Sequence, residues 1–344
     1  NSTGWHNATE FTGGTEGTHY GVNTTGKYVW ANITSFGSIF APMGEEAKLP
    51  KIDSLVINTS PHNMNLTWEN LTAYVTSSNT DTVIYSWSVD DVPYSNLLMP
   101  FDTNNSTTTK DYSGYGNNGT ITGAEWTSSG KVGGAYEFNN GLIQISDSDS
   151  LDLTSQGTYM FWFKANNWPS TYGCLLQKGT NTGGWCTNAN AASMNLFNHH
   201  AGDYLALSIC SAPGVSAGSV RIEPRPSIGV WHFYAFTLNG THLVSYLDGE
   251  INATANQLGD MYINTHPFNI GRSSTSNFIN GTMDDVAIYN RSLSAEQIKQ
   301  IYLDTKDGFS DNRTIVSQET NFGENWSVTV TPISVEMEDE GIAE

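Results

Sequence analysis

The sequence predicts an all-β protein with more than one domain, and three observations support this. First, 344 residues are enough for two or three domains, each with a core of its own. Second, 33 glycines and many aromatic residues accompany a charged fraction of only 14%, which suits strands joined by tight turns. Third, short runs of alternating apolar and polar residues recur along the chain, as expected for strands with one buried face.

The net charge of −20 excludes one class of partner. Such an acidic chain offers no basic face for phosphate groups, so we expect no nucleic-acid partner. The acidity also suits a secreted protein whose surface must stay soluble. No apolar run reaches the ~18 residues that would span a bilayer, so no membrane span is expected in this chain. The missing initial Met fits a removed signal peptide or a fragment of a longer protein.

Strand-like segments outside the centre of the chain form two groups with a long interruption between them. The first group is spaced like the first half of an immunoglobulin-like sandwich, with Trp87 as its core aromatic residue. The second group would supply the strands that this half lacks. The predicted strands are 51–58, 66–75, 82–89, 314–318 and 325–332.

Three motifs lie in the interruption, in the order DYSGYGNNGT, SGKVGGAYEFNNG and FINGTMDDVAIYNRSLSAEQIKQIY. Over residues 96–305 the chain resembles a bacterial or archaeal laminin-G-like (concanavalin A-like) jelly-roll domain. This resemblance implies two packed antiparallel sheets whose first and last strands lie side by side. The strands would be separated by turns rich in Gly, Asn and Ser.

The flanking groups carry a second resemblance. TVIYSWSV and ETNFGENWSVTVTP are similar to strands of the immunoglobulin-like repeats of archaeal surface proteins. The two resemblances imply a laminin-G-like jelly-roll sandwich inserted in, or flanked by, an immunoglobulin-like β-sandwich. A module whose terminal strands are neighbours can be inserted with little strain. The expected segments are an N-terminal β-strand segment (1–50), the two halves of the immunoglobulin-like domain (51–95 and 310–344) and the jelly roll (96–305).

One helix is predicted, over residues 294–303. Ser294 and Gln297 fit a capping box, and Leu293 can pack on Ile298. The apolar stripe of this helix should lie on the sandwich. We expect the helix to be structural.

No catalytic role is expected. Glycosidases with concanavalin A-like folds need two carboxylates that face each other across a cleft. Glu137 stands alone, and the consecutive Asp284 and Asp285 would point to opposite faces of a strand. His199 and His200 lie on a predicted hairpin tip, where we expect a solvated loop rather than a metal site.

Calcium is the predicted metal, with Asp102, Asp111, Asn117 and Asp284 as its ligands. Hard cations bind several oxygens from carboxylates, amides and carbonyls. The laminin-G resemblance implies that the segments bearing these residues meet at one edge, so a site there would tie the first strand to the last. The alternative is that the same polar groups cap turns by hydrogen bonds.

Carbohydrate binding is the activity that the laminin-G resemblance implies. It requires aromatic faces for the sugar rings and polar groups for their hydroxyls. Trp168, Tyr172 and Trp185 are the predicted ligand-binding residues, because they lie in or near predicted loops. The alternative is that these aromatic residues belong to the core or to a surface shielded by glycans.

Two features indicate an oxidising, extracellular location. Cys186 and Cys210 flank a predicted hairpin and are favoured as a disulfide over pairs with Cys174. About sixteen Asn-X-Ser/Thr sequons predict N-linked glycans, unless they only reflect an Asn- and Thr-rich composition. Asn118 and Asn280 are weaker candidates because each lies inside a laminin-G motif. The predicted glycosylation sites are Asn1, Asn7, Asn23, Asn32, Asn58, Asn65, Asn70, Asn104, Asn105, Asn239, Asn252, Asn290, Asn312 and Asn325.

These observations predict a non-catalytic glycoprotein of archaeal type at the cell surface. The leading function is a structural subunit of an extracellular filament, sheath or surface layer. The alternative is a glycan-binding adhesin that uses the laminin-G-like domain.

Self-association by strand donation is the predicted mode of assembly. The sandwich built from 51–95 and 310–344 ends in an acidic tail where a closing strand should run, which leaves an apolar groove. Residues 27–34 of a neighbouring chain would fill it in a head-to-tail contact. The alternatives are that residues 1–50 fold back on their own chain or belong to a neighbouring domain.

Overall fold

A computed structural model describes residues 20–23, 28–31, 49–60, 69–170, 172–179, 192–199, 201–273, 277–308 and 312–334. Contacts divide the chain into two compact units, Asn1–Leu49 and Pro50–Glu344. In the first unit, β1 (Tyr20–Asn23) and β2 (Tyr28–Ala31) form an antiparallel hairpin. Among the described residues, no helix has the length and apolar character needed to cross a membrane.

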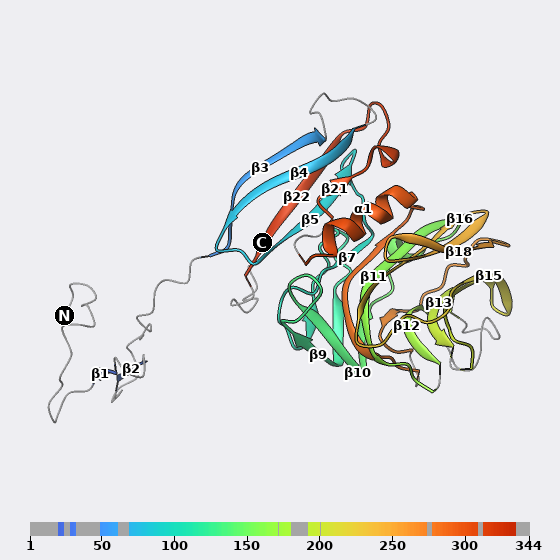
Figure 1. The fold of residues 1–344 in the computed structure, drawn as a ribbon, viewed down its shortest axis with the longest axis horizontal. Helices are drawn as coiled ribbons and strands as arrows, with labels where there is room; N and C mark the ends of the chain where they lie inside the picture. Colours follow the sequence, from blue (N-terminus) through green and yellow to red (C-terminus); the bar gives the residue numbers. More distant parts are fainter. Residues whose placement is uncertain are drawn as a thin grey trace. The chain divides into compact units, whose positions relative to one another are not determined.

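Most strands of the second unit form one continuous 14-stranded antiparallel sheet that folds into a jelly-roll sandwich (Figure 1). The sheet runs in the order β15-β14-β13-β12-β19-β10-β20-β11-β16-β17-β18, with β7 beside β20 and β9 beside β10. The elements of this part are β7 (Leu97–Met99), β8 (Thr108–Thr109), β9 (Gly119–Thr127), β10 (Ala135–Ile145), η2 (Asp149–Leu151), β11 (Gln156–Asn167), β12 (Gly173–Lys178), β13 (Met194–His199), β14 (Tyr204–Ala212), β15 (Val215–Ile222), β16 (Trp231–Asn239), β17 (His242–Leu247), β18 (Glu250–Asn256), β19 (Phe268–Ile270), β20 (Asn280–Tyr289) and the helix α1 (Ala295–Thr305).

Alternation along the strands decides which side chains enter the core of the jelly roll. In β11, Tyr159, Phe161 and Phe163 point between the two layers. Tyr159 stacks on Phe268 of β19 with ring centroids 6.5 Å apart, a contact from one layer to the other. The core therefore lies between the layer that contains β11 and the layer that contains β12 and β19.

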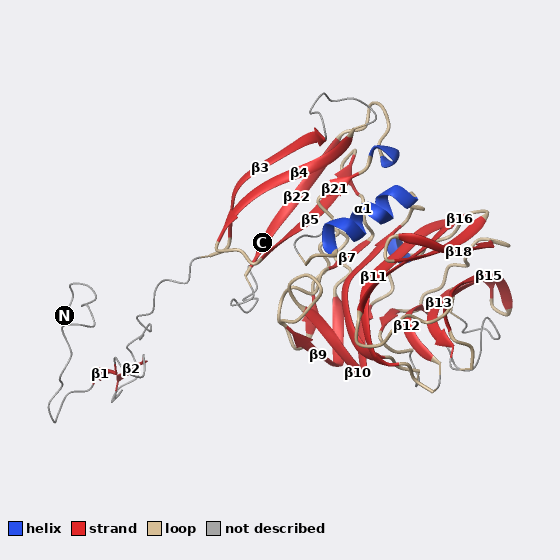
Figure 2. Ribbon diagram, in the orientation of Figure 1, coloured by secondary structure: helices blue, strands red, loops and turns tan. Residues whose placement is uncertain are grey.

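The outward face of β11 is apolar as well. Met160 and Trp162 belong to a second buried cluster, together with Ile298 of α1 and Trp87 from the segment before the jelly roll. The indole Nε1 of Trp162 donates to Thr305 Oγ1 at 3.0 Å, which fixes the end of the helix. Figure 2 shows α1 between the jelly roll and the strands β3, β4 and β22. The helix thus covers one outer face of the sandwich, as predicted.

The start of α1 follows the predicted cap only in part. Ser294 Oγ accepts a hydrogen bond from Gln297 N at 3.1 Å. The amide of Gln297 bonds elsewhere: its Nε2 donates to Thr314 O at 2.9 Å, and its Oε1 accepts from Val316 N at 2.8 Å. Ser294 N donates instead to Glu319 Oε1 at 2.7 Å. The helix start is therefore tied to the segment that follows it.

A small module of two three-stranded sheets is built jointly by the segments before and after the jelly roll. In one sheet β22 pairs with β5, from Thr82 opposite Ile333 to Val89 opposite Trp326. In the other sheet β21 pairs with β4. The elements of this module are β3 (Lys51–Ser60), β4 (Asn70–Ser78), β5 (Thr82–Val89), β6 (Val92–Pro93), β21 (Thr314–Ile315), η3 (Ser317–Glu319) and β22 (Trp326–Ile333).

The small module has no core separate from the jelly roll. Trp87 lies at its centre, and its Nε1 donates to Asn312 O at 2.9 Å. Tyr94 packs edge-to-face on Tyr289 of β20 with ring centroids 5.5 Å apart. Because these residues share one apolar cluster, the small module and the jelly roll lie in one compact unit.

Truncation of Trp87 tests this shared core. We expect Trp87→Ala to lower the free energy of unfolding by about 3–5 kcal/mol, because a fully buried indole is lost. Far-UV circular dichroism and tryptophan fluorescence in urea should show one transition at a lower midpoint for residues 50–344. Ser88→Ala, the next position of β5, is the control. An early, separate transition that leaves the jelly roll folded at the wild-type midpoint would contradict a shared core.

Candidate functional site

A row of six polar side chains crosses the face of the second layer that points away from the core. Strand register places them side by side, one on each of six strands. At least one neighbour of each residue along its strand belongs to the core, so the alternation puts the six on the opposite face. We call this the polar row; it consists of Gln144, Asn269, Gln177, Asn195, Ser208 and Ser219.

Most members of the polar row have hydrogen-bond partners within it or beside it. Gln144 Nε2 donates to Asn269 Oδ1 at 2.9 Å, and Ser208 Oγ donates to Ser219 Oγ at 2.9 Å. Asn195 Oδ1 accepts from the thiol of Cys174 at 3.6 Å. These hydrogen bonds fix the orientation of the amides and hydroxyls on this face of the sheet.

Gln177 is the exception at the centre of the polar row. Its side chain is 0% exposed, yet neither Oε1 nor Nε2 has a hydrogen-bond partner among the described residues. A buried polar atom without a partner costs about 1–3 kcal/mol. Such a group in a native fold calls for an explanation, and one explanation is a partner outside the chain.

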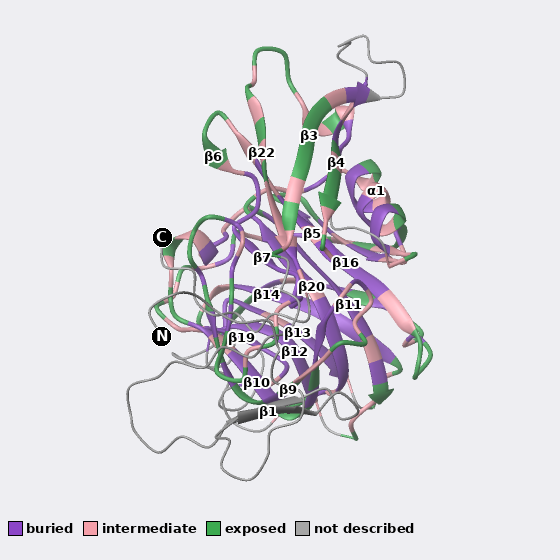
Figure 3. Ribbon diagram, turned by 90° about the vertical axis from the view of Figure 1, so that its left-hand side faces the viewer, coloured by how far each residue is buried: buried purple, intermediate pink, exposed green. Residues whose placement is uncertain are grey.

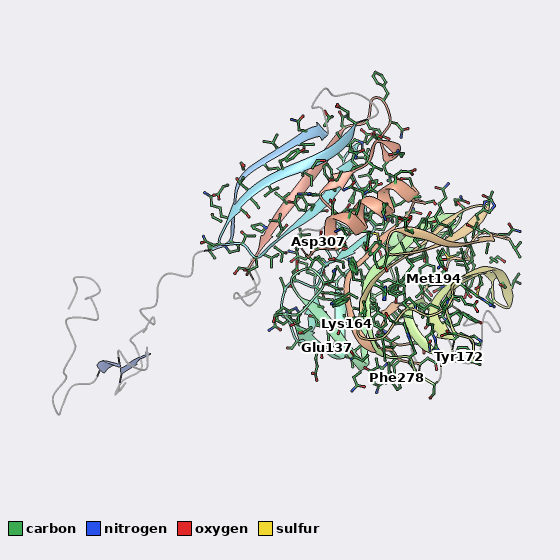
Figure 4. The ribbon with its side chains drawn as sticks, in the orientation of Figure 1. Glu137, Lys164, Tyr172, Met194, Phe278 and Asp307 are labelled. Atoms are coloured by element: carbon green, nitrogen blue, oxygen red, sulfur yellow. The ribbon has the colours of Figure 1, made fainter. Side chains whose placement is uncertain are left out.

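An aromatic cluster lies on the same face, at the end of β13 and β14. His199 stacks on Tyr204 with centroids 4.6 Å apart, and Tyr172 packs edge-on against His199 at 5.1 Å and Phe197 at 6.0 Å. The Arg221 guanidinium lies 4.1 Å from the centroid of Tyr204. Figure 4 places Tyr172 at the end of the jelly roll remote from β3 and β4. We call Tyr172, Phe197, His199 and Tyr204 the aromatic cluster.

His199 is not the solvated loop residue that we expected. Its Nδ1 accepts from Gly202 N at 2.9 Å, and its ring is held between Tyr172 and Tyr204. His200 lies outside the described residues. Asp203 is 2.9 Å from Arg225 Nε, an ion pair at the edge of the same hairpin.

The three predicted ligand-binding aromatics have different outcomes. Tyr172 is half-buried and belongs to the aromatic cluster. Trp168 packs on the jelly-roll core next to Phe163, and its Nε1 donates to Pro226 O at 3.1 Å, which corresponds to the core alternative. Trp185 lies outside the described residues. The candidate site therefore contains one predicted residue and a polar row that sequence reasoning missed.

The signal for the polar row was present but incomplete in the sequence. Each of the six residues has an apolar neighbour on at least one side along its strand, as in Leu-Leu-Gln-Lys or Phe-Asn-Ile. Such a residue is ordinary when a strand is considered alone. Only the register between strands that are distant in sequence shows that the six residues are neighbours.

The cysteines and sequons also occupy defined places. Cys210 is disulfide-bonded, Cys174 is a buried free thiol, and Cys186 lies outside the described residues. Asn312 contradicts its predicted glycosylation: it is 6% exposed, and its Nδ2 donates to Tyr289 Oη at 3.2 Å. The exposed predicted sites are Asn104, Asn239, Asn252, Asn290 and Asn325. The half-buried sites are Asn58, Asn70 and Asn105, and the sites whose side chains lie outside the description are Asn1, Asn7, Asn23, Asn32 and Asn65.

Among the predicted calcium ligands, Asp111 holds a turn together. Its Oδ1 accepts from Leu98 N and Ser113 N, both at 2.9 Å. Its Oδ2 accepts from Ser113 Oγ at 2.7 Å and Asn117 N at 2.8 Å. Asn117 Nδ2 in turn donates to Asn96 O at 2.9 Å. Both oxygens of this carboxylate therefore already accept protein hydrogen bonds.

Asp284 and Asp102 hold the turn formed by the SGKVGG motif. Asp284 Oδ2 accepts from Lys131 N at 2.7 Å and Val132 N at 3.0 Å. Asp102 Oδ1 accepts from Gly134 N at 2.9 Å on the other side of the turn. The two acidic residues thus hold the SGKVGG turn from both sides.

Steric crowding explains why position 133 is a glycine. Its φ is +56°, and a Cβ there would lie 2.1 Å from Asp102 Oδ1. Asp102 Oδ2 accepts from Thr82 Oγ1 of β5, so this carboxyl also links the small module to the jelly roll. Any larger residue at 133 would displace it.

Three of the four predicted calcium ligands, Asp102, Asp111 and Asp284, accept hydrogen bonds from the protein. No group of three or more His, Cys, Asp or Glu side chains is placed to hold a metal ion in the described part of the chain. The hydrogen bonds of Asp102, Asp111 and Asp284 correspond to the turn-capping alternative.

The carboxyl of Asp102 should make stability depend on pH. Burial raises its pKa to about 7, although bonds from Thr82 and Gly134 act in the opposite direction. The folded state therefore keeps this proton to a higher pH than the unfolded state. The protonated carboxyl therefore contributes to the free energy of unfolding, by roughly 4 kcal/mol at most. This contribution is fully present below about pH 4 and is lost as pH rises through about 7.

Unfolding free energies of the wild type and Asp102→Asn, measured between pH 4 and 8, test this expectation. The free energy of unfolding of Asp102→Asn should decline less with rising pH than that of the wild type, because an amide does not titrate. Thr82→Val removes a bond to the ionised carboxyl and should shift the decline to higher pH. Identical profiles for all three proteins would contradict the assignment.

Residues 138–299 match the model of a family described as the concanavalin A-like lectin/glucanases superfamily. No match was found among curated proteins.

Solved structures with a similar fold include two toxin binding domains and one domain of an arabinanase. The binding domain of Paraclostridial Mosquitocidal Protein 1 is 16% identical, with a TM-score of 0.47, over 65% of this chain and 52% of that one. The botulinum neurotoxin serotype G binding domain is 14% identical, with a TM-score of 0.47, over 61% and 50%. Domain 4 of AbnA, a GH43 extracellular arabinanase from Geobacillus stearothermophilus solved with arabinotriose, is 17% identical, with a TM-score of 0.44, over 62% and 98%.

The match spans about half the length of the two toxin binding domains. The family model covers the strands from β10 to β20 and the start of α1. Residues 138–299 of this chain are therefore similar to the concanavalin A-like lectin/glucanase domains of this family.

Proposed function

We propose that this chain is an extracellular, non-catalytic protein that binds carbohydrate on the polar row and the adjoining aromatic cluster. The observation that carries the proposal is the polar row, in which Gln144, Asn195 and Ser219 are half-buried and the central Gln177 is a buried amide with no hydrogen-bond partner among the described residues. A ligand hydroxyl both donates and accepts, so it matches an amide that offers one acceptor and one donor.

The rest of the face supports the same ligand class. Amides and hydroxyls stand in a line across six strands, which suits a sugar with several hydroxyls. Tyr172 and His199 are half-buried aromatic side chains at one end of the line. Tyr204 is enclosed by His199 and Arg221, so it supports the cluster and does not offer a free ring face. The matched family is described by lectins and glucanases, which bind carbohydrate.

An extracellular, cell-surface location is part of the proposal. Cys210 is disulfide-bonded, and disulfides persist in oxidising compartments. Exposed sequons such as those at Asn239 and Asn252 are accessible to N-linked glycans. Laminin-G-like domains are typical of the same compartment.

A second candidate function is a structural subunit of an extracellular filament, sheath or surface layer of archaeal type. One observation favours it: the small module has an open apolar edge. The two functions are compatible, because the polar row and this edge belong to different parts of the second unit.

Replacement of Gln177 tests carbohydrate binding. Gln177→Met keeps the volume and removes the unpaired amide. We expect binding on a glycan array to be lost. The free energy of unfolding should stay equal or rise, because the replaced amide makes no hydrogen bond within the described part of the ligand-free protein. Gln318→Met, at an exposed glutamine on η3, is the control and should bind as the wild type does.

Two results would refute the proposal. One is a wild-type protein that binds no glycan on the array. The other is a Gln177→Met variant that keeps its binding or unfolds several kcal/mol more easily, since this amide would then serve the fold alone.

A further inference from the structure

The small module is open along one side. Its two sheets end there in β3 and β22, because among the described strands β3 pairs only with β4 and β22 pairs only with β5. An edge strand presents a row of unpaired backbone N–H and C=O groups. Residues of β3 and β22 approach each other, so the two edges lie on the same side of the module.

The side chains that point between the two sheets are incompletely covered at this side. Leu55 and Ile57 of β3 face inward with Val75 and Ala73, yet each remains 38% exposed. Val328 of β22 is only partly buried against the shared core. Figure 3 shows β3 as largely exposed, whereas the jelly-roll strands are largely buried. The sandwich has the apolar surface of a closed core without the strand that would close it.

A groove of about 340 Å³ marks the end of this gap. Ile57 and Leu71 form one wall and Trp326 forms the other. At its rim, Phe322 is 96% exposed, which is unusual for a large aromatic side chain. Exposed aromatic residues beside a groove are typical anchors for a protein partner.

We propose that this side of the small module binds one extended strand from a second copy of the chain, supplied by its N-terminal unit. A strand inserted here would bond to the backbone of β3 or β22 and place alternate side chains against Leu55, Ile57 and Val328. This inference deepens the second candidate function and is independent of carbohydrate binding.

The N-terminal unit has the properties of a donor. Its described strands β1 and β2 form a two-stranded hairpin, which cannot bury a core of its own. The sequence of β2, Tyr-Val-Trp-Ala, is apolar on both faces. Lys27 is the one charged residue between positions 20 and 31, whereas the groove has the half-buried carboxylate of Glu324 in its lining. The charges of donor and acceptor are therefore complementary.

A donor and an acceptor on different parts of the chain make a heterologous contact. Such a contact repeats from copy to copy and produces a linear polymer unless its rotation closes a ring. The geometry thus predicts head-to-tail growth, with each molecule receiving one strand and giving one.

Paired substitutions on β3 test the acceptor. Ile57→Asp puts a charge in the gap, whereas Val56→Asp puts the same charge on the opposite face of the same strand. Phe322→Ser changes an exposed loop residue, so it cannot unfold the module. We expect Ile57→Asp and Phe322→Ser to weaken self-association of the full chain by tenfold or more, and Val56→Asp to leave it unchanged, in light scattering after size-exclusion chromatography.

A mixing experiment tests the donor. Val29→Asp/Trp30→Asp changes both faces of β2 and should also prevent self-association. Mixed with the Ile57→Asp protein, it should form a 1:1 complex and nothing larger, because one protein keeps its acceptor and the other its donor. Circular dichroism of each variant should retain the wild-type strand signal.

Several outcomes would overturn the inference. One is a wild-type chain that stays monomeric at hundreds of micromolar, which is the result expected if the N-terminal unit binds to its own chain. Another is self-association that is unaffected by Ile57→Asp and Phe322→Ser. A mixture of the two variants that forms no complex would also overturn it. If polymers form regardless of the acceptor variants, the filament function stands and only this contact is wrong.

Discussion

The pairing of β7 with β20 is the contact on which the architecture of the second unit depends. Leu97–Met99 lie antiparallel to Val286–Ile288, so the chain enters and leaves the jelly roll at neighbouring strands. Because the two crossing points are adjacent, β5 and β22 can pair although the whole jelly roll lies between them in sequence. The apolar cluster around Trp87 and Trp162 then seals the small module onto the sandwich.

The two outer faces of the jelly roll obey the same alternation and have opposite chemistry. On β11 the outward residues are Met160 and Trp162, and α1 with the small module covers them. On β12 and β13 the outward residues include Gln177 and Asn195, which no helix covers among the described elements. The identity of the outward residues therefore decides which face packs against the helix and the small module and which face carries the polar row.

Features that depend on neighbours in sequence could be predicted, and features that depend on distant register could not. The strands, the Ser294 cap and the core position of Trp87 follow from local pattern. The partners of Gln297 do not, since they lie on a segment that the insertion brings back. Likewise, Trp168 near a loop gave no sign that its ring would pack on Phe163. The polar row needed the register of six strands.

The order of the strands has a mechanical consequence. A pulling force applied at Lys51 and Ile333 acts first on the hydrogen-bonded pairs β3–β4 and β5–β22, because these strands flank the insertion. The jelly roll lies on a closed loop of the chain whose two ends meet at β7 and β20. It therefore carries no tension until the small module separates. Under load, the small module yields first, and the jelly roll stays relaxed.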